Sequence, residues 1–201
     1  MSIELLGNLK NPRTLVIGVF HGDEPQGDFL VRKYLEKFKD SNLLFVPCLN
    51  KYGFEHNVRT NSNGVDLNRN FPTKNWELTE KNEFYGGISP ASEKETRFVM
   101  ELIEKYQPEI ILTLHAPFKI VNYDGAKTEC ELKLLEKISN IMEYPLEASV
   151  GYPTPGSFGT WSGIEKGILT ITLELDEEID VQLLEPKVFK VFELLEGIKN
   201  E

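Results

Sequence analysis

The sequence predicts one α/β domain over residues 1–201, built on a mainly parallel, mixed sheet with helices on both faces. The strand-like runs are apolar on both sides, whereas strands with one face in water would alternate apolar and polar residues. Amphipathic stretches separate these runs, which is the order expected when helices cover both faces of a parallel sheet. The chain is long enough to bury most of its apolar surface in one domain, and no break in composition indicates a second one.

Runs rich in Val, Ile, Leu, Phe and Thr are expected to form the strands. Along the chain they are residues 14–20 (TLVIGVF), 43–49 (LLFVPCL), 110–114 (IILTL) and 168–175 (ILTITLEL). The amphipathic stretches between them are expected to form helices over residues 28–38, 92–103 and 127–142, with a last helix that begins near Pro186.

The second of these helices carries a start signal, and the segment before it is irregular. Ser92 and Glu95 have the spacing of a capping box. Residues 51–85 are rich in Asn and Gly and show no sustained periodicity, and unstructured segments of this length are usually functional or disordered. This segment contains Arg59 and Arg69, whose side chains are suited to binding a ligand. The alternative is an ordinary surface loop without a binding role.

The charge balance excludes several classes of partner. The chain has 22 basic and 32 acidic residues, and its net charge of -10 repels nucleic acid and anionic membranes. The first residues lack a basic and apolar targeting signal, and no apolar run approaches membrane-spanning length. We therefore expect a cytoplasmic protein that binds neither nucleic acid nor membrane. Nothing in the sequence indicates an oligomeric state.

The two cysteines carry no functional signal. Cys48 lies in a predicted strand and Cys130 at the start of a predicted helix, and neither has a second cysteine at a pairing distance along the chain. Both are therefore expected to be small core residues rather than members of a disulfide framework.

Ionisable residues gather where the predicted strands end. His21 follows LVIGVF, His115 follows IILTL, and Glu174 lies inside ILTITLEL. Ligands of an open α/β sheet bind outside the carboxyl ends of its strands, so we expect these side chains to converge on one crevice. Glu24 follows His21 across a short turn that Gly22 makes easy. Two imidazoles and one carboxylate leave one position of a tetrahedral zinc ion open to water, which is the arrangement of a hydrolytic metal site.

Plain alternatives exist for each of these residues. A single His-x-x-Glu pair is common and usually lies at a helix start. The chain has only three histidines, however, and two of them follow strands. The carboxylate of Glu174 would be costly to bury unless a cation or a reaction requires it. His56, in the irregular segment, has no comparable partner and is expected to be an ordinary residue.

These motifs are collinear with those of the zinc carboxypeptidase family, which the chain resembles over nearly its whole length. HGDE resembles the first two zinc ligands, LHAP the third ligand, and ITLEL the strand that carries the catalytic glutamate. RTNSNGVDLNRNFP resembles the substrate-binding stretch of the family, and GVDLNRNF is the most specific of these matches. YGGISPASEKET and GYPTPGSFGTW are similar to the branch of the family that hydrolyses murein peptides.

The resemblance implies a zinc carboxypeptidase-like fold and a metal-dependent reaction. It implies one Zn²⁺ per chain, bound by His21, Glu24 and His115. It also implies that Glu174 is the general base and acid and that Arg59 polarises the scissile carbonyl.

The resemblance assigns further residues to the substrate. Asn68 and Arg69 match the pair that holds a terminal carboxylate, and Asp66 matches the residue that orients the first zinc histidine. Tyr152 matches the mobile tyrosine that covers the substrate, with a packed turn as its alternative. Gly159 occupies the region where basic-specific members have an acid, so the resemblance does not support selection for Lys or Arg. Because the chain is shorter than the digestive members, other pocket details are not carried over.

The activity implied is that of a zinc metallopeptidase in cell-wall recycling. It would hydrolyse the γ-D-glutamyl-meso-diaminopimelate bond of murein tripeptide, a small peptide that is its expected partner. One alternative is an N-acyl amino acid deacylase of the aspartoacylase or succinylglutamate desuccinylase type, against which GYPTPGSFGTW argues. A non-catalytic peptide-binding module is the other alternative, and the intact set of metal and base residues argues against it.

Overall fold

A seven-stranded sheet forms the centre of the protein. The computed structural model describes residues 3–148 and 151–198, and its strand order is β1-β3-β2-β4-β7-β5-β6. The strands are β1 (Leu6–Gly7), β2 (Thr14–Ile17), β3 (Leu44–Val46), β4 (Ile110–His115), β5 (Ile120–Asp124), β6 (Leu146–Glu147) and β7 (Leu169–Glu174). Strands β3, β2, β4 and β7 are parallel to one another, whereas β1 and β5 run antiparallel to their inner neighbours. This confirms the predicted mainly parallel, mixed sheet.

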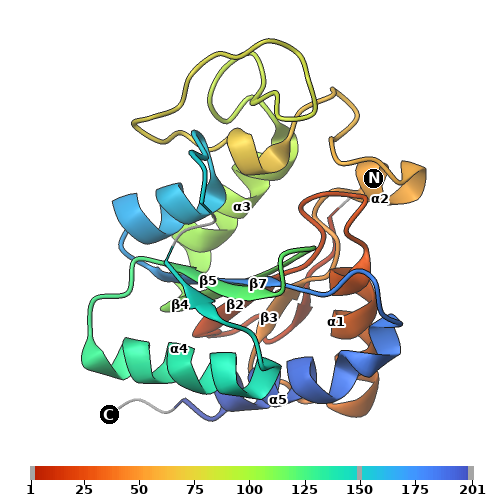
Figure 1. Cartoon of the computed structure of the whole chain (residues 1–201), viewed down its shortest axis with the longest axis vertical. Coiled ribbons are helices and arrows are strands. Elements are labelled where there is room, and N and C mark those ends of the chain that lie inside the picture. Colours follow the sequence, from red (N-terminus) through yellow and green to blue (C-terminus); the bar gives the residue numbers. More distant parts are fainter. Residues whose placement is uncertain (1–2, 149–150, 199–201) are drawn as a thin grey trace.

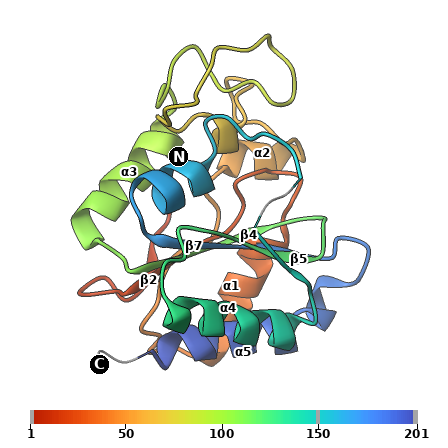
Figure 2. The same ribbon diagram turned by 60° about the vertical axis from the view of Figure 1, so that its left-hand side comes forward.

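Helices cover both faces of the sheet. The α-helices are α1 (Gln26–Lys37), α2 (Lys51–His56), α3 (Lys94–Tyr106), α4 (Glu129–Met142) and α5 (Glu185–Glu196). There are also short 3₁₀-helices at η1 (Leu67–Arg69) and η3 (Val181–Leu183), and a π-helix at η2 (Thr160–Glu165). Helices α1, α4 and α5 lie on one face, and α3 and η2 lie on the other (Figures 1 and 2). Among the described residues, no helix is both long enough and apolar enough to cross a membrane.

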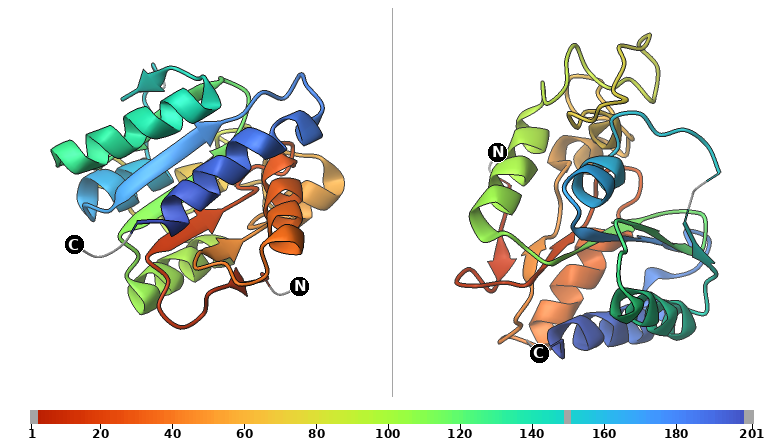
Figure 3. Two further views of the ribbon diagram at one scale, coloured as in Figure 1. Left: turned by 90° about the horizontal axis from the view of Figure 1, so that it is seen from below. Right: turned by 90° about the vertical axis from the view of Figure 1, so that its left-hand side faces the viewer.

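The two faces of the sheet pack into two separate apolar clusters, and alternate residues of β2 enter different ones. Val16 packs with residues of α1, α4 and α5, including Phe192, on the face that Figure 3 shows from below. Leu15 and Ile17 pack on the opposite face with residues of α3 and η2, including Trp161. Each fully buried side chain of this size contributes about 1.5–3 kcal/mol. The strand is apolar throughout because neither of its faces meets water.

The strands leave the sheet earlier than the apolar runs predict. The run 14–20 is a strand only to Ile17, and the run 43–49 only to Val46. Val19 has a φ of 21°, which is not a strand conformation, and Pro47 has no N–H to donate to a neighbouring strand. The apolar residues beyond these points are buried under the loops that carry the candidate site.

The capping box predicted for α3 does not form. Its N-cap residue is Glu93, without a side-chain cap, and the Ser92 hydroxyl instead donates to Oε1 of Glu93 at 2.6 Å. A capping box is present at α4, where Thr128 and Glu131 satisfy each other's backbone N–H groups. Sequence spacing alone did not distinguish these two helix starts.

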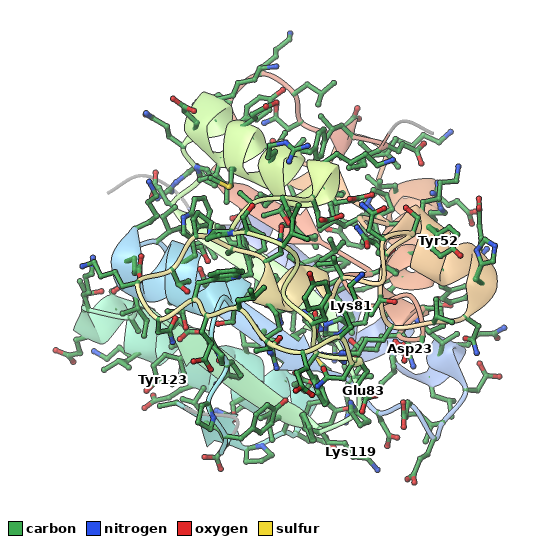
Figure 4. The ribbon with its side chains drawn as sticks, turned by 90° about the horizontal axis from the view of Figure 1, so that it is seen from above. Asp23, Tyr52, Lys81, Glu83, Lys119 and Tyr123 are labelled. Carbon is green, nitrogen blue, oxygen red and sulfur yellow. The ribbon has the colours of Figure 1, made fainter. Side chains whose placement is uncertain are left out.

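The segment 51–85 is more ordered than predicted. It contains α2 and η1, and side chains cap both: Asn50 accepts from the N–H of Gly53 at 2.9 Å, and Asp66 accepts from that of Asn68 at 2.8 Å. Helices this short show no hydrophobic period in sequence, which explains the miss. The remainder is irregular chain above the sheet, and in Figure 4 the part that carries Lys81 and Glu83 lies over the middle of the view.

The cysteine expectation is wrong for one residue. Cys130 is exposed in the first turn of α4, and Cys48 is half-buried beyond the end of β3. Both are free thiols, as expected, and burial raises the pKa of Cys48 to about 12.

Candidate active site

The first candidate residues lie in the turn between β2 and α1. The N–H of Glu24 donates to the carbonyl oxygen of His21 at 3.2 Å, which closes the turn. A Cβ at Gly22 would lie 1.8 Å from the backbone carbon of Gly53, so only glycine allows the turn to rest on α2. The side chains of His21 and Glu24 are buried.

His115 joins this pair because β4 is the parallel neighbour of β2 and His115 is its last residue. Nδ1 of His21 lies 2.7 Å from Oε1 of Glu24, and Nδ1 of His115 lies 2.9 Å from Oε2 of Glu24. One ligand atom from each residue lies within 4.8 Å of the others. Two imidazole nitrogens and a carboxylate oxygen, buried and converging, fit a zinc ion with an open fourth position.

Asp66 holds the outer side of this group. Its carboxylate is fully buried, and Oδ1 lies 3.0 Å from Nε2 of His21. The other oxygen, Oδ2, accepts from Nε and Nη2 of Arg59 at 3.0 and 2.9 Å. Because Nε2 of His21 is occupied by Asp66, Nδ1 is the nitrogen that remains for a metal.

The charges in this group favour a cation at its centre. Burial alone would lower the pKa of His21, but the charges of Asp66 and Glu24 outweigh it and raise that pKa to about 9. Burial alone would raise the pKa of Glu24, but the imidazoles of His21 and His115 hold it well below its usual range. For His115 burial prevails and lowers the pKa. Buried carboxylates that stay ionised beside neutral or cationic imidazoles give the environment of a metal site.

Glu174 stands beside the metal-type group as a buried carboxylate with one unpaired oxygen. It is the last residue of β7 and is the register partner of His115 on β4. Its Oε2 is buried, with no hydrogen-bond partner among the described residues. Burial, and then the charge of Glu24, raise the pKa of Glu174 to about 8. Such a carboxyl group exchanges a proton readily near neutral pH.

Arg59 and Arg69 face the same pocket, with one aromatic ring against both. Nη1 of Arg59 lies 3.6 Å from Oε1 of Glu24. The guanidinium carbons of Arg59 and Arg69 lie 5.2 and 5.9 Å from the ring centroid of Phe84. Phe84 was not predicted from the sequence, because it lies in a segment with no regular structure to place it.

Asn68 and Arg69 are positioned by η1 and by the opposite wall of the pocket. Oδ1 of Asn68 accepts from the backbone N–H of Phe158 at 2.8 Å, and Nη1 of Arg69 donates to the carbonyl oxygen of Asn68 at 2.7 Å. The structure therefore brings together the predicted arginines, the predicted asparagine and the metal-type group in one pocket.

Tyr152 lies at the mouth of this pocket. It is 45% exposed and also lines an outer cavity together with Phe118. The segment that carries it packs on the long irregular segment through Trp76, which lies against Gly156 on one side and Gly86 on the other. Tyr152 thus lies between the pocket and the outer cavity.

The pocket also contains an acid that the sequence did not indicate. Asp124, at the end of β5, lines it beside Gly159. Position 159 has no acid, as the sequence shows, but β5 supplies a carboxylate to the same place. The strand was not predicted because IVNYD is short and half polar, and alternation was its one available signal. His56 lies elsewhere, exposed on α2 and stacked on Tyr52.

Comparison with known protein sequences identifies relatives of this chain. The family described as zinc carboxypeptidase matches residues 5–190. Murein peptide amidase A of Escherichia coli strain K12 is 35% identical over 161 residues, which cover 73% of this chain and 64% of that protein. Murein peptide amidase A of Vibrio campbellii is 33% identical over 185 residues, which cover 82% of this chain and 70% of the relative. The chain thus spans less than two thirds of the length of the Escherichia coli relative.

Solved structures show the same fold. The murein-tripeptide amidase MpaA from Escherichia coli O157 superposes with a TM-score of 0.84 at 29% identity, covering 98% of this chain and 87% of that one. Thrombin-activatable fibrinolysis inhibitor superposes with a TM-score of 0.72 at 16% identity, covering 96% of this chain and 68% of that one, and at this identity it shows the fold alone.

Proposed function

Because this chain belongs to the zinc carboxypeptidase family, we propose that it is a zinc-dependent amidopeptidase for murein tripeptide. It would hydrolyse the bond between γ-D-glutamate and meso-diaminopimelate, in the cytoplasm, during cell-wall recycling. The observation that carries this proposal is the convergence of His21, Glu24, His115, Glu174 and Arg59 on one pocket. The relatives named as murein peptide amidases support the substrate class.

The proposed reaction is amide hydrolysis by an activated water. A zinc ion held by His21, Glu24 and His115 would acidify that water and polarise the scissile carbonyl. Glu174 takes the proton from the water and later gives it to the leaving amine, a role that its raised pKa suits. The guanidinium of Arg59 stabilises the negative charge that develops on the carbonyl oxygen, and a donor of this kind typically contributes about 3 kcal/mol.

Asp66 has a positioning role in this scheme. It fixes the ring of His21 and the guanidinium of Arg59 with one carboxylate. It therefore sets the geometry of the metal site and of the carbonyl-binding group together.

Asn68 and Arg69 select the end of the substrate. A guanidinium binds a carboxylate bidentately, and in this proposal these residues hold the free carboxylate of a terminal diaminopimelate. Adding D-alanine at that carboxylate converts it to an amide, which leaves Arg69 without an anionic partner and displaces the scissile bond. The tripeptide should therefore be preferred over the tetrapeptide, and Tyr152 would cover the bound peptide.

Mass spectrometry of the products from defined murein peptides tests this proposal. We expect L-alanyl-γ-D-glutamyl-meso-diaminopimelate to yield L-alanyl-D-glutamate and free diaminopimelate. The kcat/KM for the tetrapeptide should be lower by about a thousandfold. Arg69→Ala should lower the rate and reduce this preference, whereas Arg32→Ala, a surface arginine of α1, should change neither.

Two results would contradict the proposal. Comparable kcat/KM values for tripeptide and tetrapeptide would reject the role of Arg69. Faster cleavage of N-acetylaspartate or N-succinylglutamate would identify the chain as a deacylase.

A further inference from the structure

Phe84 is the one aromatic residue of the described part of the chain whose ring contacts both arginines of the pocket. The guanidinium carbon of Arg59 lies 5.2 Å from its ring centroid, and that of Arg69 lies 5.9 Å from it. Both distances are in the range of a cation–π contact, in which the negative face of the ring attracts the cation. One ring therefore contacts the two cations that the proposed reaction assigns to the scissile carbonyl and to the terminal carboxylate.

Arg69 is a buried cation without a counter-charge in direct contact. Its side chain is 7% exposed. Within residues 3–148 and 151–198 its guanidinium forms no ion pair, and its one hydrogen bond runs from Nη1 to the carbonyl oxygen of Asn68 at 2.7 Å. A buried charge with so little compensation is costly. The face of the Phe84 ring supplies part of the missing compensation.

The ring leaves N–H groups of both arginines open. A carboxylate binds a guanidinium along its edge and occupies its N–H groups, whereas an aromatic ring lies against its face. Asp66 holds one edge of Arg59 through Nε and Nη2, at 3.0 and 2.9 Å. Nη1 of Arg59, and Nε and Nη2 of Arg69, make no hydrogen bond to any described residue. These are the donors that a carbonyl oxygen and a carboxylate require.

The backbone around Phe84 is held in place. The N–H of Phe84 donates to Oδ1 of Asn82 at 2.8 Å. The carbonyl oxygen of the next residue, Tyr85, accepts from the N–H of Asp66 at 2.9 Å, and Tyr85 itself is buried. The ring of Phe84 is half-exposed and lines the outer cavity. The segment that carries the two arginines therefore also sets the position of the ring.

We propose that Phe84 is a positioning residue that holds the guanidinium groups of Arg59 and Arg69 through cation–π contacts and leaves their remaining N–H groups free for the substrate. This rests on the proposed function, because it takes Arg59 to bind the scissile carbonyl and Arg69 to bind the terminal carboxylate of the peptide. The ring thereby links the place of the reaction to the place that binds the end of the substrate.

Phe84→Leu removes the aromatic face and keeps an apolar side chain. A weaker hold on Arg59 should lower kcat by about 2- to 5-fold, because this arginine acts on charge that develops in the transition state. A weaker hold on Arg69 should raise KM by about 2- to 5-fold, because this arginine binds the carboxylate before the reaction. For the zinc-loaded protein and the tripeptide, kcat/KM should therefore fall by about 5- to 30-fold. Phe84→Tyr and Phe84→Trp keep an aromatic face and should leave both constants within about twofold of their original values.

Phe54→Leu is the matched control, because Phe54 is an exposed phenylalanine of α2. It should change neither constant. A loss of folded protein in Phe84→Leu would lower kcat and the zinc content together and leave KM unchanged. The expected rise in KM at full zinc content therefore separates the positioning role from a structural one.

Replacement of Phe84 by pentafluorophenylalanine tests the nature of the contact. The ring keeps its shape, but fluorine withdraws the electron density that makes its face negative. The positioning role predicts the same fall in kcat and the same rise in KM as for Phe84→Leu. Constants equal to those of the unmodified protein would overturn it, because apolar packing would then account for the ring.

Chemical modification of the arginines by phenylglyoxal tests the contact without turnover. Peptide mapping by mass spectrometry measures the labelling of each arginine, and Arg32, an exposed arginine of α1, is the internal reference. The fluorinated ring still covers Arg69 but attracts it less. The ratio of Arg69 to Arg32 labelling should therefore rise by about 2- to 5-fold in the fluorinated protein.

The outcomes separate the positioning role from the proposed function. Cleavage of the tripeptide with equal constants for the unmodified protein, Phe84→Leu and the fluorinated protein overturns the positioning role and leaves the proposed function intact. No cleavage by the unmodified protein, together with labelling of Arg69 that depends on fluorination, overturns the proposed function and supports the contact between ring and arginine. Labelling of Arg69 that is independent of fluorination overturns the positioning role whatever the turnover.

Discussion

Oδ1 of Asp66 lies 3.0 Å from Nε2 of His21, deep below the surface of the site. The same carboxylate also binds Arg59, so a residue that touches neither the water nor the peptide in the proposed reaction fixes both a proposed metal ligand and the proposed carbonyl-binding group. Removing its charge should therefore affect metal binding and catalysis together.

Asp66→Asn tests this positioning role. The amide keeps the size of the side chain but loses the charge that holds the imidazole and the guanidinium. We expect zinc affinity to fall by about 10- to 100-fold, measured by competition with a chromogenic chelator. Asp180→Asn is a matched control, because Asp180 caps η3 as Asp66 caps η1 and is exposed. Unchanged zinc affinity in Asp66→Asn would show that His21 is oriented without it.

His115→Ala tests the metal site itself. The protein should bind about one zinc per chain, and removing one of three protein ligands should strongly weaken binding. His56→Ala, which removes the exposed histidine of α2, should retain the metal. Elemental analysis after dialysis measures both, and full zinc occupancy in His115→Ala would rule out this ligand set.

Glu174→Gln separates chemistry from binding. The substitution preserves size and removes the proton acceptor, so kcat should fall by about a hundredfold or more while zinc content and substrate affinity stay unchanged. Single-turnover kinetics and metal analysis on the same sample measure these quantities. Near-normal turnover would mean that another residue activates the water.

Asp124→Asn should make the protein more stable at neutral pH. Folding raises the pKa of Asp124 from 3.8 to about 6, so the folded state disfavours its ionised form. The resulting destabilisation is absent below pH 3.8, grows as the pH rises to about 6, and is complete above it. The substitution should therefore raise the free energy of unfolding by about 1–3 kcal/mol at pH 7.5 and by little at pH 4.

Denaturant unfolding at both pH values measures this effect, and Glu104→Gln serves as the control. A gain in stability that is the same at pH 4 and pH 7.5 would contradict the assigned ionisation. A gain confined to neutral pH would show that the acid is retained at the expense of stability, as is typical of a binding residue.

The sequence predicted those parts of the site that follow long apolar strands. His21, His115 and Glu174 were found because each lies at or near the carboxyl end of such a strand, where ligands of parallel sheets bind. Asp124 and Phe84 were not predicted, for two different reasons. The first lies on a strand too short and polar to be recognised, and the second depends on how an irregular segment folds back over the arginines.

The same limits apply to the fold. The central parallel strands are continuous apolar runs and the flanking helices have strong periodicity, so both were predicted, whereas β1, β5 and β6 have neither signal. A capping box was predicted at Ser92, and the one at Thr128 was missed although it has the same spacing, because only the packed structure decides which hydroxyl meets a free backbone N–H.

The intrinsic fluorescence of Trp76 can report on the state of the site. The chain has two tryptophans, and Trp161 is packed in the core against Phe71, with ring centroids 5.4 Å apart. Trp76 instead fills the space between Gly86 and Gly156, on the two segments that border the pocket. A displacement of either segment changes the polarity around this indole. Peptide binding should therefore be visible as a shift in intrinsic fluorescence, without any label attached to enzyme or substrate.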